Sequence, residues 1–340
     1  MLFRSTVSLG VSTDVAFRMG QIATTLTAVT VTSTGSEIAE TRTGAATAVS
    51  QTALEQLPTI SRRIDDFTRL TPQASGSSFA GVDNRLNNIM VDGAYFNNSF
   101  GLSGQPGDRT GVSPISIDAI EALQVNIAPY DVRQGNFTGA AVNTITKSGD
   151  NEFSGSVYTQ WRDQSMVGTR VGGRAFNPGT FDYSQIGFRL GGPILKNKLF
   201  FFVSYESDGL TEPGTTWRAN EGGETVTGQV TRVLRSDLDS LSSFLNNSFS
   251  YQTGPYQDYD HEVPSMRLTA KFDYALNDRH KFSFRYSKLD SKTDVLLSNS
   301  SSLGFGTRRT NANGLNFQNS NYQILEIIDS YVAEWNAVIG

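Results

Sequence analysis

The sequence contains no cysteine and only two histidines. The missing thiols exclude disulfides, thiol catalysis and cysteine metal sites. His261 and His280 lie far apart in the sequence, so we expect neither a histidine metal centre nor a serine–histidine triad. No glycine-rich phosphate loop with its lysine is present. We therefore predict no enzymatic activity and no cofactor.

Long apolar runs and charged residues are also scarce. The most conspicuous apolar run, Leu199–Val203, is far shorter than the roughly 18 residues of a membrane helix. This excludes a helical membrane protein but not a β-barrel, whose strands alternate lipid-facing and lumen-facing residues. Charged residues make up 18%, with a net charge of -5 and no basic block, so nucleic acid is excluded as a partner. The 21 Phe, 12 Tyr and 32 Gly suit many strands joined by loops.

The N-terminal residues carry no secretory signal, because Met1–Arg4 precedes Ser-, Thr- and Gly-rich sequence rather than an apolar stretch. We expect residues 1–22 to be the last strands of a small β-sandwich and residues 23–42 to be a linker. Inside this linker lies a run of high β propensity, Val29, Thr30, Val31 and Thr32. Such a run can add to the sheet edge of a partner or form an ordinary linker strand.

Residues 43–150 have the pattern of a compact α+β unit. One helix is expected where Ser61 precedes Ile64, Phe67 and Leu70, and it should end at Thr71-Pro72. A second is expected where Asp118 and Glu121 have capping-box spacing, and it should bury Ile120 and Leu123. Strands are expected at 88–91, before an Asp-Gly turn, and at 123–127 and 141–146.

After Asn151 apolar residues recur at every second position, which predicts strands. Six segments show this alternation: 153–161, 186–190, 199–205, 268–274, 282–286 and 331–337. Their opposite faces carry charges, including Arg189, Arg267, Lys271 and Arg285. Alternation alone fits a soluble sandwich as well as a barrel.

The lengths of the connections distinguish these two folds. Short turns at 195–198 and 276–280 alternate with long connections after Trp161, Tyr205 and Tyr286. This segregation is typical of an outer-membrane barrel with periplasmic turns and extracellular loops. The longest loop contains Asp258, Asp260 and Glu262, which can bind calcium or remain solvated.

Several motifs resemble the TonB-dependent outer-membrane receptors. Ile117–Val125, followed by Val142–Gly149, resembles the signature of the family's plug domain, and Ile89–Gly93 resembles its earlier strand and turn. Gly191–Ile194, followed by Lys198–Phe202, looks like the second and third barrel strands of the Oar-like branch. The resemblance spans nearly the whole chain.

The resemblance implies an α+β plug domain followed by antiparallel transmembrane β-barrel strands. Residues 1–22 would be the remnant of a carboxypeptidase-regulatory-like sandwich, 23–42 the linker, 43–150 the plug and 151–340 the first part of the barrel. A family barrel has about 22 strands, so the resemblance implies an incomplete barrel and a sequence that is a fragment.

The implied function is energised uptake of a large solute, such as a glycan, a peptide or a metal chelate. The implied partners are the inner-membrane TonB transducer, outer-membrane lipid and an extracellular solute. Val29, Thr30, Val31 and Thr32 would form the Ton box, which pairs with the transducer. A plug loop would face the solute, with Tyr95, Phe96, Asn97, Asn98 and Phe100, or contact nothing. Arg189, Arg267, Lys271 and Arg285 would face the lumen. The alternative is a non-transporting surface adhesin or glycan-binding outer-membrane protein.

Overall fold

A computed structural model describes residues 45–57, 59, 62–98, 104–127, 135, 137–172, 174–175, 179–297 and 308–338. The expected sandwich remnant, the linker with Val29–Thr32, Ser61 and Phe100 lie outside these residues. The chain divides into two units. The first comprises Met1–Asp108 and Ser116–Lys147, and the second comprises Arg109–Ile115 and Ser148–Gly340. In the part that the structure describes, no helix is long and apolar enough to cross a membrane.

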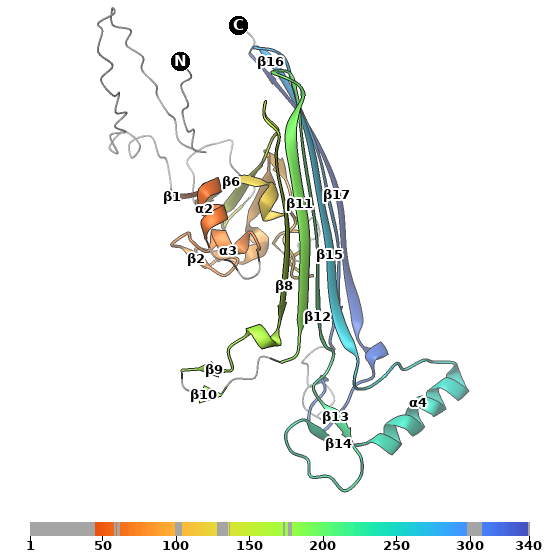
Figure 1. Ribbon diagram of the computed structural model, residues 1–340. Coiled ribbons are helices and arrows are strands. Elements are labelled where there is room, and N and C mark those ends of the chain that lie inside the picture. Colours follow the sequence, from red (N-terminus) through yellow and green to blue (C-terminus); the bar gives the residue numbers. More distant parts are fainter. Residues whose placement is uncertain are drawn as a thin grey trace, which may run out of the picture. The chain divides into compact units, whose positions relative to one another are not determined.

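The first unit is built on a five-stranded sheet with the order β1-β6-β7-β4-β5 (Figure 1). Strands β4 and β7 are parallel and the other pairs are antiparallel. In chain order the strands are β1 (Ala45–Val49), β4 (Asn88–Val91), β5 (Ala94–Tyr95), β6 (Ile120–Ile127) and β7 (Ala141–Thr146). Two α-helices, α2 (Gln51–Gln56) and α3 (Asp65–Thr68), the small β2 (Ala74–Ser75)–β3 (Ser78–Phe79) hairpin and the 3-10 turn η1 (Asn84–Leu86) accompany the sheet. The core contains Ile64, Phe67, Ile89, Leu123 and Val142.

The prediction of a helix that buries Ile120 and Leu123 is wrong. The side chain of Ser116 accepts a hydrogen bond from Asp118 N, and it caps only the 3-10 turn η2 (Ile117–Ala119). The chain then enters β6 directly, so Ile120 and Leu123 are buried from a strand. Capping-box spacing is met equally by one turn that leads into a strand, and pairing with β1 and β7 decides in favour of the strand.

The other predicted helix is shorter than expected. Helix α3 contains four residues, with Ile64 and Phe67 buried as predicted. Leu70 lies beyond its end and is exposed, so it does not belong to the apolar face. Pro72 disfavours helical backbone only at Thr71, so it does not account for an end three residues earlier.

The second unit is a six-stranded antiparallel sheet with the order β17-β16-β15-β12-β11-β8. All six predicted strands are present, and each is longer than its alternating segment. They are β8 (Ser154–Asp163), β11 (Asp182–Leu195), β12 (Leu199–Pro213), β15 (Asp260–Asn277), β16 (His280–Val295) and β17 (Tyr322–Ala337). Within the described residues the sheet is open, with β8 and β17 at its edges.

The connections of this sheet differ in length between its two ends, as predicted. Lys196–Lys198 and Asp278–Arg279 form the tight turns at one end. The long connections at the other end contain η3 (Gln164–Met166), β9 (Arg170–Val171), β10 (Arg174–Ala175), β13 (Arg218–Asn220), β14 (Val230–Leu234), α4 (Arg235–Phe249) and η4 (Gln318–Ser320). Helix α4, which projects sideways beyond this loop end, has no counterpart among the sequence predictions (Figure 1).

Candidate functional site

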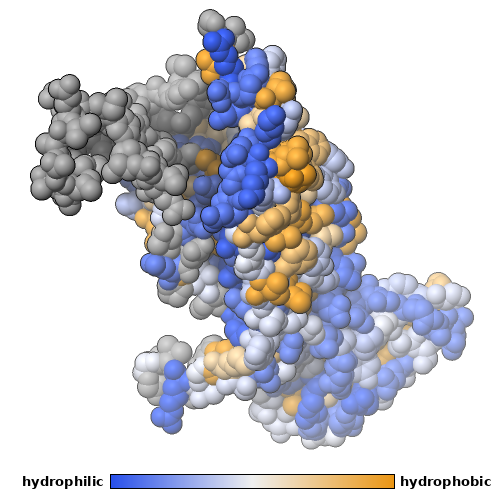
Figure 2. Space-filling model, turned by 45° about the horizontal axis from the view of Figure 1, so that its top comes forward, coloured by the Kyte–Doolittle hydropathy of each residue, from blue (hydrophilic) through white to orange (hydrophobic). Residues whose placement is uncertain are grey.

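One face of the six-stranded sheet is covered by exposed apolar side chains. Figure 2 shows hydrophobic residues gathered over the strands, with hydrophilic residues toward the loop end. Val157 is 80% exposed and Trp161 67%. In the row across the middle strands, Phe272 lies between Phe201 and Phe284. Burying apolar surface is favourable by about 25 cal/mol per Å², so a face of this kind requires an apolar environment.

Aromatic side chains form rows on this apolar face. Near the tight turns, the Phe282 ring lies 6.4 Å from that of Tyr274 and 6.0 Å from that of Trp335. Nearer the loops, Tyr286 and Tyr331 lie 4.9 Å apart. These rows add aromatic surface to the apolar face.

The height of the apolar face also suits a membrane. On β11, exposed apolar residues extend from Ile186 to Leu195. At about 3.3 Å per residue and a strand tilt near 45°, this stretch crosses roughly 20 Å, close to the apolar band of about 25 Å in outer-membrane barrels. On β16, the apolar residues of this face are followed, toward the loop end, by the charged Lys288. Its Nζ lies 3.9 Å from Asp329 Oδ1 of β17.

The opposite face of the sheet is polar and largely buried. Arg267, Lys271 and Arg285 lie on it, each less than a tenth exposed. Arg189 is half-buried on the same face and donates a hydrogen bond of 3.0 Å to Ser156 Oγ. The structure therefore brings the four predicted cations to one face, opposite the apolar one.

Arg267 is at the centre of a buried ionic network. Its Nη1 lies 2.6 Å from Glu206 Oε1, and its Nη2 contacts Asp208 and lies 2.8 Å from Ser265 Oγ. Ser265 also donates to Asp208 at 2.5 Å. Glu206 is 0% exposed and Arg267 4%, so the pairing compensates charges that are removed from water.

A glycine extends this network to a third strand. The Tyr158 hydroxyl of β8 donates to the Glu206 carboxylate of β12, and its ring crosses Gly187 of the intervening β11. A Cβ at position 187 would lie 2.8 Å from Tyr158 Cε1. A side chain at this position would therefore displace the tyrosine ring from above the strand.

Two long connections fold together at the loop end, and we term them the loop module (214–259 and 308–321). Hydrogen bonds join them, from Gln318 N to the Pro255 carbonyl at 2.7 Å and from Arg232 N to the Ala312 carbonyl at 2.9 Å. The Tyr256 and Phe317 rings meet edge to face at 5.8 Å. The core of the module contains Ala219, Leu238 and Leu315, with Trp217, Val233, Tyr256 and Phe317 packed against it. The sequence alone indicated only long loops here.

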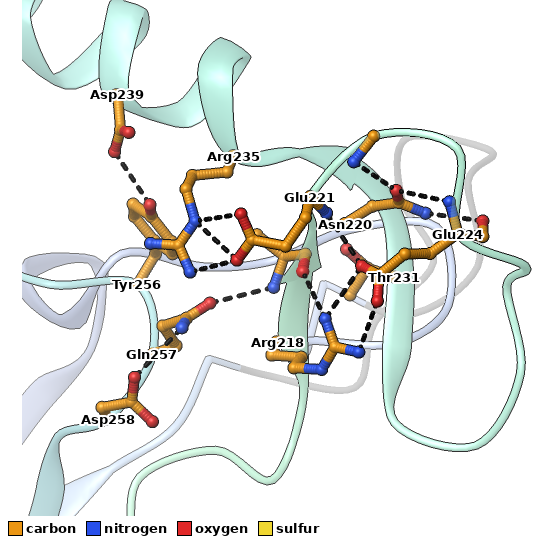
Figure 3. Close-up of polar contacts among 12 residues, drawn as sticks. Arg218, Asn220, Glu221, Glu224, Thr231, Arg235, Asp239, Tyr256, Gln257 and Asp258 are labelled. Atoms are coloured by element: carbon orange, nitrogen blue, oxygen red, sulfur yellow. Dashed lines mark hydrogen bonds and ion pairs between the residues drawn. The ribbon is translucent and has the colours of Figure 1, made fainter.

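The charges of the loop module pair with one another (Figure 3). Arg218 binds both oxygens of Glu224, at 2.7 and 2.9 Å, and Arg235 binds both oxygens of Glu221, at 2.5 to 2.8 Å. The hydrogen bonds from Arg218 lower the pKa of the Glu224 carboxyl to about 2. Both guanidinium groups are therefore used in organising the module.

The Glu224 pKa predicts how the module responds to acid. Because the pKa is lowered from 4.5 to about 2, its contribution to stability is complete above pH 4.5 and is lost as the pH falls through about 2. Arg218→Gln should return the pKa toward 4.5, so protection of the Glu221 amide, which donates to Glu224 at 2.8 Å, should already be lost near pH 4. Hydrogen exchange corrected for intrinsic rates measures this. Arg235→Gln is the matched control, and an identical pH profile in wild type and Arg218→Gln would contradict the prediction.

The distal half of α4 presents a second apolar surface. Leu238 is buried in the module, whereas Leu241, Phe244 and Phe249 are exposed. The Phe244 and Phe249 rings lie edge to face at 5.9 Å. Because the helix is rich in Ser and Asn, its composition resembles a loop, which is why sequence reasoning missed it.

The loop predicted to face the solute has mixed orientations. Tyr95 is 61% exposed on β5, but Phe96 is only 6% exposed and belongs to the core. The Asn97 side chain accepts from Ile89 N at 2.6 Å and donates to Asn88 Oδ1 at 2.9 Å. Phe96 is therefore part of the core and the Asn97 side chain binds back to β4, while contact of this loop with a solute stays a prediction. Asn98 is half-buried.

The remaining candidates form no metal site in the part that the structure describes. There, no three His, Asp or Glu side chains are grouped so as to hold a metal. Asp258 of the acidic cluster accepts from Gln257 Nε2 at 3.0 Å. His261 is buried 3.5 Å from Asn321 Nδ2, and His280 lies 3.3 Å from Trp335 Nε1.

Some known proteins are similar to this chain in sequence, and others are similar in fold. Residues 145–220 match the family model of an outer membrane beta barrel domain. The TonB-dependent transporter Oar of Myxococcus xanthus is 26% identical over 250 residues, which cover 69% of this chain and 22% of that protein. The chain thus spans about a fifth of this relative.

Two solved structures are similar. The outer membrane transporter YddB from Escherichia coli has a TM-score of 0.51 at 13% identity, covering 75% of this chain and 34% of that chain. The siderophore receptor PirA from Acinetobacter baumannii has a TM-score of 0.49 at 17% identity, covering 77% and 34%. At these identities the likeness concerns the fold alone. By name these proteins are transporters and receptors. The chain is therefore similar to the TonB-dependent transporter Oar and matches an outer membrane beta barrel domain, and its location is the cell outer membrane.

Proposed function

We propose that this chain contributes the plug and the first barrel strands of a receptor for TonB-dependent uptake of a large solute. The observation that carries the proposal is the inverted polarity of the six-stranded sheet, with an apolar outer face and buried charges such as Arg267 and Arg285 opposite. A soluble sheet buries its apolar face, whereas a barrel in lipid exposes it. The similarity to Oar supports the same function.

In this proposal the first unit is the plug, corresponding to residues 43–150, and residues 151–340 belong to the barrel. Residues 1–22 are the sandwich remnant, and 23–42 the linker with the Ton box Val29–Thr32. That segment would add as a strand to the sheet edge of the TonB transducer. The polar face with Arg189, Arg267, Lys271 and Arg285 would line the lumen.

The loop module, with the apolar end of α4, would be the surface that meets the solute outside the cell. Its two connections are already joined by hydrogen bonds and a shared core, which preorganises the surface. A glycan, a peptide or a metal chelate would suit its exposed aromatic side chains. Tyr95 stays a candidate contact on the first unit.

Deleting Val29–Thr32 from the complete receptor tests the proposal, because the deletion removes the attachment of the transducer. Uptake from a panel of glycans, peptides and iron chelates should cease, while binding of the same solute to cells should persist. Deletion of Thr24–Thr27 from the same linker is the length-matched control. Unchanged uptake would contradict the proposal, and binding without any uptake by the wild type would favour the adhesin.

A further inference from the structure

A short segment inside the first unit's sequence belongs structurally to the second unit. Arg109–Ile115 groups with the six-stranded sheet, although Asp108 and Ser116 on either side belong to the first unit. The buried Thr110 Oγ1 lies 2.9 Å from Ser291 Oγ of β16 and donates to Glu326 Oε2 of β17 at 3.3 Å. Ser291 also donates to the Glu326 carbonyl at 3.3 Å. Thr110 thus forms part of a hydrogen-bonded group on two strands.

The residues just before this segment are held within the first unit. Arg63 Nη2 lies 3.4 Å from Asp108 Oδ1 and 3.1 Å from Asp65 Oδ2. The backbone N–H of Gln105 donates to Asp108 Oδ2 at 3.0 Å. The transition between the two units therefore falls at one peptide bond, Asp108–Arg109.

The chain passes between the units at two further places, after Ile115 and after Lys147. Lys147 N donates to the Ala119 carbonyl at 2.8 Å inside the first unit. Gly149 already packs on the second unit, where a Cβ would lie 2.7 Å from the Gly192 carbonyl oxygen. The chain is thus tied to its own unit on both sides of the crossing after Asp108 and of the crossing after Lys147.

We propose that Arg109–Ile115 is a wall-anchored segment that remains on β16 and β17 while the first unit rearranges during transport. Parts of a protein that move together are usually those that contact one another. Thr110 contacts β16 and β17, so we expect its segment to move with the six-stranded sheet. Rearrangement is then confined to the residues on either side, up to Asp108 and from Ser116 to Lys147. This inference rests on the proposed energised uptake.

Cysteine labelling tests the anchored segment, because the 340 residues contain no cysteine of their own. Thr110→Cys reports on the segment, and Thr68→Cys, at an equally buried threonine of α3, reports on the first unit. The complete receptor is labelled in cells with a membrane-impermeant maleimide, with the proton gradient intact or dissipated. Energisation should raise labelling of Thr68→Cys several-fold and leave that of Thr110→Cys unchanged.

The other outcomes are distinguishable. An equal rise at Thr110→Cys overturns the anchored segment but leaves energised uptake standing. No rise at either position overturns the proposed uptake and this inference with it. A disulfide between Thr110→Cys and Ser291→Cys, added to Thr68→Cys, is a second measurement. Energised labelling at position 68 should be the same with this disulfide oxidised or reduced, and its loss on oxidation overturns the inference.

Discussion

Arg267→Met is expected to destabilise the receptor by about 3–5 kcal/mol, the usual cost of removing one partner of a buried ion pair. The Glu206 side chain is fully buried, and Asp208 is nearly so. Without the guanidinium, both carboxylates lose the positive charge that Arg267 supplies, while the Tyr158 hydroxyl still donates to Glu206. Methionine retains most of the apolar volume, so the loss reflects charge rather than a cavity. Urea unfolding of the complete receptor in lipid vesicles measures the change.

Two variants separate this effect from general damage to the strand. Arg279→Met, in the exposed turn between β15 and β16, should change the unfolding free energy by less than about 0.5 kcal/mol. Adding Glu206→Gln to Arg267→Met should recover part of the loss, because the buried carboxylate that Arg267 paired with is then neutral. A cost below about 1 kcal/mol, as for an exposed pair, would show that the network is solvated in the intact receptor.

Local rules accounted for much of the second unit. Alternation with period two depends only on neighbouring residues, so it located the six strands and placed Arg267, Lys271 and Arg285 on one face. Which charges meet depends on register, which alternation does not determine. Arg267 lies opposite Glu206 only because Leu199 pairs with Tyr274 and each strand continues in step. The network with Tyr158 was therefore not predictable from the pattern.

In the first unit, local sequence motifs were present but belonged to structures other than the predicted ones. The spacing of Asp118 and Glu121 fits a helix, yet Ser116 caps a single turn before β6. Likewise, an aromatic and an amide after a tight turn suggested contact with a ligand. Burial of Phe96 under the hairpin is a tertiary effect that needs β4 and β5 in place. The same reason hid the membership of Arg109–Ile115 in the second unit.

Phe272→Arg is expected to destabilise the receptor in a bilayer by about 2–4 kcal/mol, the cost of a cation near the midplane of a barrel's lipid face. Phe272 lies on a central strand between Phe201 and Phe284, within the apolar face, so an arginine here is surrounded by apolar side chains. Thr211→Arg is the matched control. Thr211 lies on β12 and on the same face of the sheet as Phe272. It pairs with Asp182 and Glu262, beyond the apolar band, so this substitution should cost less than about 1 kcal/mol.

The dependence of this cost on the lipid decides what covers the apolar face. If the face meets hydrocarbon, vesicles with shorter acyl chains should reduce the cost of Phe272→Arg, because a thinner bilayer lets the guanidinium reach the interface. If another protein layer covers Phe272, as in a sandwich, the cost should be the same in thick and thin bilayers. A cost independent of thickness would therefore contradict the transmembrane barrel, even if Phe272→Arg were strongly destabilising. Since inverted polarity carries the proposed transport function, this comparison tests its physical basis without knowledge of the solute.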